Sequence, residues 1–287
     1  MRNIFTLFIS LAICTVSYGQ SFPFKITESS WYPKDFDGSF VRRNNIKAIN
    51  VKSFSSLYSL SAKHDASRTF LFDEEGQMIQ FVELGKNDTS QIREFDYNDR
   101  GVLRWELKED KIYNKSYKAG YRFDGNKNIY QVKNYEMINK DDVMLIESRR
   151  YIYNADSQLV AIKFLQNNQV KQVQKFTYDE LGRTTSESEE DAVGMTKKKV
   201  SYAYNDMDLL VQVKTETETN NVVEYNYVYN VAGNPIEAEW KENGVQMGVM
   251  SYVYDNNGML VQMNRVLNQA PGIKHASSQV FEYIANE

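Results

Sequence analysis

Residues 251–261 read SYVYDNNGMLV, a pattern of strand, tight turn and strand. Tyr252 and Tyr254 are two residues apart, so their side chains share one face of a strand. Asp255 can accept hydrogen bonds from backbone amides two residues further on, which starts a turn. Gly258 takes a positive φ without steric cost, as a tight hairpin requires. The segment is therefore predicted to form a β-hairpin with two aromatic side chains on one face.

Versions of this hairpin recur along most of the chain. The position of Tyr254 is aromatic in eight copies spaced 25 to 30 residues apart, at Phe72, Tyr97, Phe123, Tyr153, Tyr178, Tyr204, Tyr229 and Tyr254. The residue two positions earlier is aromatic in every copy, and the next residue is Asp or Asn, as in Asp179 and Asn230. Five copies have glycine four positions later, at Gly76, Gly101, Gly182, Gly233 and Gly258. Such a near-constant period is the signature of a repeat architecture.

Three copies lack the turn glycine and carry Lys127, Ser157 and Asp208 at its position. A side chain with a Cβ atom is disfavoured at positive φ. In these copies we expect either a turn of another type or a strained turn.

The repeats predict an all-β fold. Each is followed by apolar residues in alternation, which indicates a returning strand. We expect one antiparallel meander of about eighteen strands, forming an elongated, curled and open sheet, because twisted sheets beyond about ten strands tend to coil or split. Residues 1–19 are predicted to be a signal peptide and 20–69 an N-terminal cap with the first strands, covering the open sheet edge. Residues 70–287 are the repeat array, ending in a truncated unit.

The first residues predict export. Arg2, the apolar run 4–16 and the small residues Ser17 and Gly19 follow signal-peptide order, with Gln20 as the new N-terminus. An alternative is a lipoprotein acylated at Cys14, although Ile13 departs from that motif. After cleavage at residue 19 the chain has no cysteine, so no disulfide forms. We expect a periplasmic, cell-surface or extracellular protein without a later transmembrane segment.

Composition and motifs exclude several functions. The formal net charge of −4 offers no bulk attraction to nucleic acid. The sequence contains no HExxH, P-loop, dinucleotide-binding or Gly-x-Ser-x-Gly motif, and we expect no catalytic residues, metal or cofactor. The two histidines, His64 and His275, form a site only if the fold brings the chain ends together. Turn chemistry explains the Asp and Gly residues without calcium.

Two repeats depart from the pattern. Leu103, Trp105 and Leu107 shift the apolar alternation by one residue, which predicts a bulge. The returning strand at 184–190 has no apolar residue and faces three lysines across a turn at 192–195. We expect neither face of this hairpin to be deeply buried, so that it either projects or marks a loosening between two halves of the array. Its charged residues form a candidate interaction surface: Glu187, Glu189, Glu190, Lys197, Lys198 and Lys199.

The pattern Tyr-x-Tyr-Asp-x-x-Gly-x-Leu resembles the YD repeat of the rearrangement-hotspot family over roughly residues 70–263, most closely at 176–184, 227–235 and 252–260. In that family, long arrays wind into a spiral β-sheet shell that can enclose a toxin domain. The resemblance implies carbohydrate or surface binding for a short exported array. Eight or nine units are few for such a shell, and no toxin domain follows residue 263, so the toxin role is not carried over.

The sequence predicts a non-catalytic exported module that binds carbohydrate or a surface protein. One alternative is a glycan-active hydrolase, which needs a cleft with two carboxylates. Another is a structural envelope protein that assembles through sheet edges. The aromatic ladder is predicted to be the core of the sheet, with Tyr252, Tyr178 and Tyr229 as scaffold. Binding is expected where the repeat pattern fails.

Overall fold

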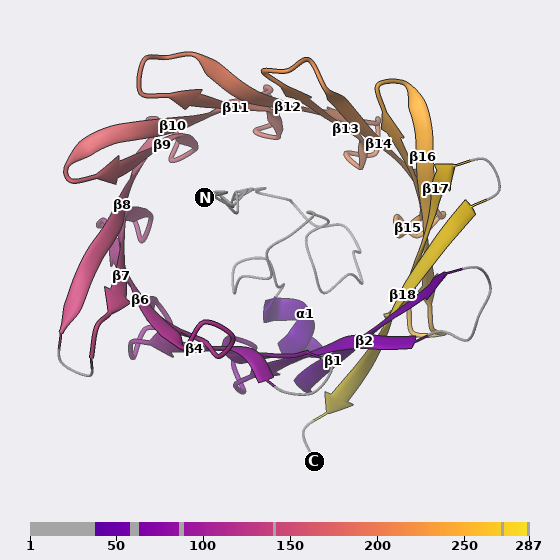
Figure 1. The fold of residues 1–287 in the computed structure, drawn as a ribbon, viewed down its shortest axis with the longest axis horizontal. Coiled ribbons are helices and arrows are strands. Elements are labelled where there is room, and N and C mark those ends of the chain that lie inside the picture. The colour runs from indigo at the N-terminus through magenta and orange to yellow at the C-terminus, as the bar shows by residue number, and fades with distance from the viewer. Residues whose placement is uncertain (1–37, 58–62, 86–88, 140–141, 271–272, 286–287) are drawn as a thin grey trace.

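The computed structural model describes residues 38–57, 63–85, 89–139, 142–270 and 273–285. The described part of the chain forms one short helix, α1 (Gly38–Arg43), and a single sheet of 18 strands. Each strand pairs antiparallel with its neighbours in sequence, and β1 (Ile46–Leu57) pairs with both β2 (Lys63–Phe72) and β18 (Ile273–Ala285). The sheet is therefore a closed barrel, seen as a ring in Figure 1.

The remaining strands complete the wall in chain order. They are β3 (Met78–Leu84), β4 (Thr89–Tyr97), β5 (Leu103–Asp110), β6 (Lys115–Phe123), β7 (Ile129–Met137), β8 (Val143–Tyr153), β9 (Leu159–Gln166), β10 (Gln169–Tyr178), β11 (Thr184–Asp191), β12 (Thr196–Tyr204), β13 (Leu210–Thr217), β14 (Val222–Tyr229), β15 (Pro235–Glu242), β16 (Val245–Tyr254) and β17 (Leu260–Ala270).

The all-β class and the antiparallel meander agree with the sequence prediction, but the open, elongated sheet is wrong. The sheet closes because β1, which lies before the repeats, pairs with β18 from Ile46 opposite Ala285 to Leu57 opposite His275. An even number of meander strands makes the first and last strands antiparallel, so they join with the same hydrogen-bond pattern as the others. Closure also removes the sheet edge that the N-terminal cap was expected to cover. Residues 1–37, including the predicted signal peptide and Cys14, lie outside the described residues.

The eight repeat turns have one geometry and lie at one rim of the barrel, since each joins an even-numbered strand to the next. In the turn after β16, Asp255 Oδ1 accepts hydrogen bonds from the amides of Asn257 (2.9 Å) and Met259 (2.8 Å). Lys127, Ser157 and Asp208 have φ of 65°, 61° and 61°, close to the 78° of Gly258. Of the two expectations for these copies, the strained turn is confirmed.

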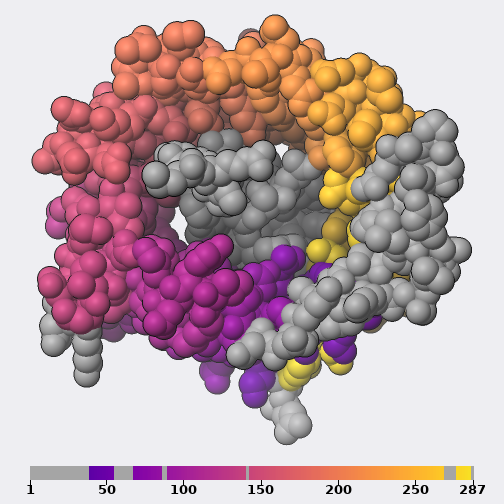
Figure 2. All heavy atoms as spheres, in the orientation of Figure 1, coloured from indigo at the N-terminus to yellow at the C-terminus, as the bar shows by residue number. Residues whose placement is uncertain are grey.

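The aromatic ladder faces the inside of the barrel, here called the luminal face. Helix α1 lies inside the ring in Figure 1, and its buried Phe40 and Val41 belong to the same core cluster as Ile49, Val51 and Phe70. The cluster continues around the wall through luminal aromatic residues such as Tyr225, Tyr227, Tyr252 and Phe281. Figure 2 shows the described wall as a thick ring. The repeat thus builds a barrel with an apolar inner collar next to the turn rim.

The predicted bulge in β5 is wrong. The register shift at Tyr97 is the same as at Tyr254 and the other turn ends, so the parity of β5 is unchanged. Glu106 lies opposite Phe95 on the luminal face, and Trp105 points to the outer face. There the indole covers Gly120, where an added Cβ would be 2.6 Å from the ring. Trp105 and Leu107 therefore lie on the outer face of the barrel, whereas Leu103 packs against the luminal core.

Candidate functional site

Luminal charges occur where the repeat pattern places apolar residues. Nine residues after the reference aromatic, six copies have a luminal apolar side chain: Phe81, Val132, Ile162, Val213, Ala238 and Met263. The other two copies have Glu106 and Glu187, whose residues are 7% and 2% exposed. A buried carboxylate is costly unless charge and hydrogen bonds compensate it. These two glutamates therefore mark the places where the inner wall is chemically specialised.

The two glutamates have equivalent partners. Tyr121 donates a 2.9 Å hydrogen bond to Glu106, and Tyr202 donates a 2.8 Å hydrogen bond to Glu187. Each tyrosine comes from the following repeat. Arg93 lies 3.4 Å from Glu106, and Gln174 donates a 2.9 Å bond to Glu187. Arg93 and Gln174 occupy the same repeat position. The Glu106 cluster therefore contains an ion pair, whereas the Glu187 cluster contains a neutral amide at that position.

A pocket of about 360 Å³ opens beside the first cluster, on the luminal side of strands β4 to β8. Its wall includes three tyrosines whose side chains face the lumen, Tyr117, Tyr121 and Tyr151. Pockets of this size, lined by aromatic residues with a few placed polar groups, are typical of small-molecule sites. The pocket is the strongest candidate binding site in the described chain.

A second ion pair lies on the opposite side of the pocket. Glu147 of β8 accepts hydrogen bonds from Arg149 Nε at 2.5 Å and from Asn134 Nδ2 at 3.2 Å. The Arg149 guanidinium lies 5.3 Å from the ring centre of Phe164, within cation–π range. These contacts hold Glu147 and Arg149 in fixed orientations, which a pre-organised binding site requires.

Lys108 adds a third cation to the pocket. Its ammonium lies 5.6 Å from the ring centre of Tyr117 and 4.0 Å from Asp110. Burial lowers the pKa of Lys108, and the nearby Arg93 guanidinium lowers it further, whereas Asp110, Glu106 and Glu83 act in the opposite direction. The net effect favours the neutral amine relative to a lysine in water.

The carboxylates of the pocket do not fit glycoside hydrolysis. In the register of the sheet, Glu106 is followed across the strands by Ala119, Asn134 and Glu147. Three strand spacings separate the two glutamate backbones by about 14 Å, whereas the two carboxyls of glycosidases are roughly 5–9.5 Å apart. An arginine pairs with each carboxylate, Arg93 with Glu106 and Arg149 with Glu147. The arrangement suits recognition.

The predicted interaction surface on the β11–β12 hairpin is split between two faces. Glu187, Glu189 and Lys198 lie on the luminal face, with Glu189 directly opposite Lys198. Lys199 lies opposite Ser188 on the outer face. The other two predicted residues form ion pairs with neighbouring segments. Glu190 lies 2.7 Å from Lys175 of β10, and Lys197 lies 2.6 Å from Glu218, which follows β13. The six residues do not form one patch, and their binding role stays a prediction.

The same hairpin does not project from the molecule. Strand β11 pairs with β10 on one side and β12 on the other, within the barrel wall. Thr184 is 1% exposed, so the expected shallow hairpin is wrong. Its polar side chains are buried because Tyr202 and Gln174 satisfy Glu187 inside the barrel. Burial also raises the pKa of Glu189, opposed by the Lys198 ammonium.

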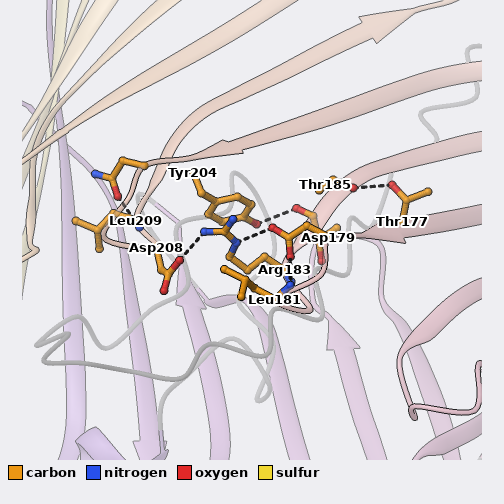
Figure 3. Close-up of polar contacts among 10 residues, drawn as sticks. Thr177, Asp179, Leu181, Arg183, Thr185, Tyr204, Asp208 and Leu209 are labelled. Carbon is orange, nitrogen blue, oxygen red and sulfur yellow. Dashed lines mark hydrogen bonds and ion pairs between the residues drawn. The ribbon is translucent and has the colours of Figure 1, made fainter.

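An arginine joins two neighbouring turns at the rim near this hairpin, as Figure 3 shows. Arg183 donates from Nε to Asp179 at 2.7 Å and from Nη1 to Asp208 at 2.5 Å. Its guanidinium stacks over the Tyr204 ring at 4.7 Å. The Asp179 carboxylate also accepts the Leu181 and Arg183 amides, and these bonds together lower its pKa despite partial desolvation. This network joins the two turns.

The scaffold residues predicted from the repeat have turn and wall roles. Asn230 and Asp179 accept the same pair of amide bonds as Asp255. Gly182 and Gly233 have φ of 78° and 79°. Among the described residues, no group of three or more His, Cys, Asp or Glu residues could hold a metal ion. His64 and His275 lie on β2 and β18, on either side of β1, and their side chains fall outside the described part.

Helices of membrane-spanning length and hydropathy do not occur in the described segments.

The pocket residues were not singled out by sequence reasoning. The signal was present at fixed repeat positions. Luminal arginines lie four residues before the reference aromatic at Arg68, Arg93 and Arg149, where later repeats carry Val200, Tyr225 and Met250. A column-by-column comparison of the repeats, with inward parity kept constant, would have found this polar sector.

Comparisons with known proteins do not assign the chain to a family. No family model matches it, and no curated protein matches its sequence. Among solved structures, a porin-like protein from Bacteroides uniformis is 8% identical, with a TM-score of 0.45, over 83% of this chain and 98% of that one. A porin-like protein from Bacteroides vulgatus is 11% identical, with a TM-score of 0.29, over the same shares. TcdB2-TccC3 without its hypervariable C-terminal region is 13% identical, with a TM-score of 0.27, over 71% of this chain and 13% of that one.

Proposed function

We propose that this protein is an exported, non-catalytic binding barrel that holds a saccharide in the luminal pocket between β4 and β8. The observation that carries the proposal is the convergence of three tyrosines and two arginine–glutamate pairs on one pocket of about 360 Å³. Aromatic faces pack against the apolar faces of sugar rings, and charged hydrogen-bonding groups fix hydroxyl orientation. The volume suits one or two sugar rings.

The charged side chains on the outer face of the barrel favour a binding site inside the lumen over one on the outer face. Its mid-strand positions carry short-range ion pairs, such as Lys214 with Glu216 at 2.7 Å and Lys241 with Glu239 at 2.8 Å. Exposed pairs of this kind contribute little energy and remain hydrated. Charged side chains at mid-strand are also costly against lipid. We propose that this wall faces water and that recognition occurs inside the barrel.

Kinship with YD repeats and export through residues 1–19 remain part of the proposal. The common turn geometry of all eight copies supports a shared repeat ancestry within the chain. Intact-mass analysis of the secreted protein tests the export step. A mass that begins at Gln20 supports cleavage by signal peptidase, and an acylated N-terminal Cys14 would identify a lipoprotein instead.

The binding proposal is tested with a glycan array on the folded, full-length mature protein, followed by calorimetry on the strongest hit. Tyr117→Ala removes one aromatic wall of the pocket and is expected to weaken binding about tenfold, since stacked aromatics contribute roughly 0.5–1.5 kcal/mol beyond area burial. Tyr113→Ala is the matched control, because Tyr113 is 72% exposed in the β5–β6 loop. The control should bind like the parent protein.

Two results would overturn the proposal. An array without any bound glycan excludes saccharide recognition by the folded barrel. A bound glycan whose affinity is unchanged in Tyr117→Ala and in Glu106→Gln places the site elsewhere. Circular dichroism on each variant distinguishes a lost site from a lost fold.

A further inference from the structure

Two cations face each other inside the pocket. Arg93 of β4 and Lys108 of β5 are directly opposite in the strand register, and both side chains point into the lumen. Like charges at directly opposed positions of paired strands are destabilising. The pairing is therefore a cost to the fold unless another group offsets it.

In the first repeat, the positions equivalent to Arg93 and Lys108 carry residues of opposite charge, so no repulsion arises there. Arg68 and Glu83 occupy the equivalent positions in β2 and β3, and they too are directly opposed. Arg68 Nε lies 2.7 Å from Glu83 Oε1, a geometry typical of a strong ion pair. Replacement of this glutamate by Lys108 in the next repeat converts an attractive pair into a repulsive one.

We infer that the Arg93–Lys108 pair holds the carboxylate of an acidic saccharide, such as a uronic acid, while the tyrosines of the pocket contact its rings. The inference rests on the proposed saccharide-binding function and specifies its ligand class. A carboxylate between the two strands would accept hydrogen bonds from the guanidinium and the ammonium together.

The luminal side chains that line the pocket carry one more positive than negative charge. They are the basic Arg93, Lys108 and Arg149 and the acidic Glu106 and Glu147, whereas the Lys118 ammonium lies over the Trp105 ring on the outer face. Asp110, 4.0 Å from the Lys108 ammonium, lies beside the pocket and offsets part of this charge. Glu106 lies 3.4 Å from Arg93 and also accepts the Tyr121 hydroxyl, so it compensates Arg93 only in part.

The electrostatics of Lys108 agree with an anionic ligand. Burial and the Arg93 charge both lower its pKa, and Asp110, Glu106 and Glu83 raise it incompletely. Ionisable groups with a shifted pKa in a cleft are typical of functional sites, where stability is exchanged for binding. A carboxylate beside Lys108 would stabilise its charged form.

The test compares digalacturonic acid with its dimethyl ester, in which the two negative charges are removed and each carboxyl gains a methyl group. Calorimetry on the full mature chain at low and at physiological salt should show about tenfold or greater preference for the acid, weakened by salt. Lys108→Met should abolish this preference and leave binding of the ester unchanged. Its melting temperature should be equal to or above that of the parent protein, because the repulsive pair is gone. A structural role for Lys108 would instead lower it.

Arg68→Gln is the matched control, since it removes a luminal arginine at the equivalent position outside the pocket. It should retain the acid preference. Equal affinity for acid and ester, or a preference that survives in Lys108→Met, would overturn the inference. If the chain binds a neutral glycan from the array but neither probe, the inference fails and the binding function stands. If no glycan binds at all, both fail.

Discussion

The hydroxyl of Tyr254 donates a 2.8 Å hydrogen bond to the backbone carbonyl of Pro235, the first residue of β15 in the preceding repeat. The same bond joins six other tyrosines to the first residue of the preceding returning strand: Tyr97 to Met78, Tyr153 to Ile129, Tyr178 to Leu159, Tyr204 to Thr184, Tyr229 to Leu210 and Tyr283 to Leu260. The reference aromatic thus fixes the position of each hairpin relative to the one before it.

Loss of one such bond should destabilise the barrel by a measurable amount. Tyr254→Phe keeps the ring but removes the donor to Pro235, and a neutral hydrogen bond contributes about 1 kcal/mol, with a larger loss if the carbonyl stays buried without a partner. Urea unfolding should show a lower midpoint. Phe123→Tyr is the reciprocal variant, because that copy lacks the hydroxyl, and it should be neutral or stabilising. A Tyr254→Phe variant as stable as the parent would show that the bond is incidental.

The buried tyrosines predict loss of stability in alkali. Burial raises the pKa of Tyr153, Tyr204 and Tyr229 to about 12, whereas tyrosine in the unfolded chain titrates near about 10. The unfolded state therefore releases these protons first as pH rises. Their contribution is fully present below pH of about 10 and is lost as pH rises toward about 12. Absorbance at 295 nm and circular dichroism should change together in this window. Full tyrosine ionisation by pH of about 11 with the fold intact would contradict this.

Glycine at the strained turn positions should raise the free energy of unfolding. Ser157 has φ of 61° in a turn where Gly258 has 78°, and a non-glycine residue there costs roughly 1–2 kcal/mol. Ser157→Gly should raise the free energy of unfolding by up to about 1 kcal/mol after the entropy cost of glycine in the unfolded chain. Gly258→Ala should lower it by a similar amount. A lower free energy of unfolding for Ser157→Gly, or a higher one for Gly258→Ala, would show that the repeats do not share one turn geometry.

Removal of the Glu187 carboxylate should be costly although the residue lies outside the pocket. Glu187→Ala leaves the Tyr202 hydroxyl and the Gln174 amide, both buried, without this acceptor. Each buried unsatisfied donor costs about 1–3 kcal/mol. Chemical denaturation should show a loss of at least about 2 kcal/mol, while Glu237→Ala on the exposed outer face of β15 should change little. A Glu187→Ala variant of parental stability would indicate that water replaces the carboxylate.

The repeat units could be predicted from sequence because their information is local. The aromatic pair, the Asx turn and the positive-φ residue all act within about ten residues, and the structure has them at the predicted positions. Closure could not be predicted in the same way. It depends on β1, which carries no repeat, and on its pairing with β18 more than 200 residues later, as in Val51 opposite Phe281. A period describes the unit of a sheet but not whether its two ends meet.

The pocket was missed for a different physical reason. Inner walls are usually apolar, so the sequence alone predicts that Trp105 and Leu107 point inward and that a bulge shifts the parity of their strand. The register keeps Glu106 inside, where Tyr121 and Arg93 compensate its charge, and Trp105 outside, where Gly120 and Lys118 cover it. Burial of charge depends on partners in neighbouring strands, and these become visible only once the pairing is known.

The central claim is that recognition occurs on the luminal face between β4 and β8. A crystal structure of the mature chain soaked with its strongest array glycan tests this most directly. The account predicts electron density for the sugar between the Arg93–Lys108 pair and Tyr117, Tyr121 and Tyr151. Density on the outer wall or on the 184–199 hairpin, with the luminal pocket free of ligand, would contradict it.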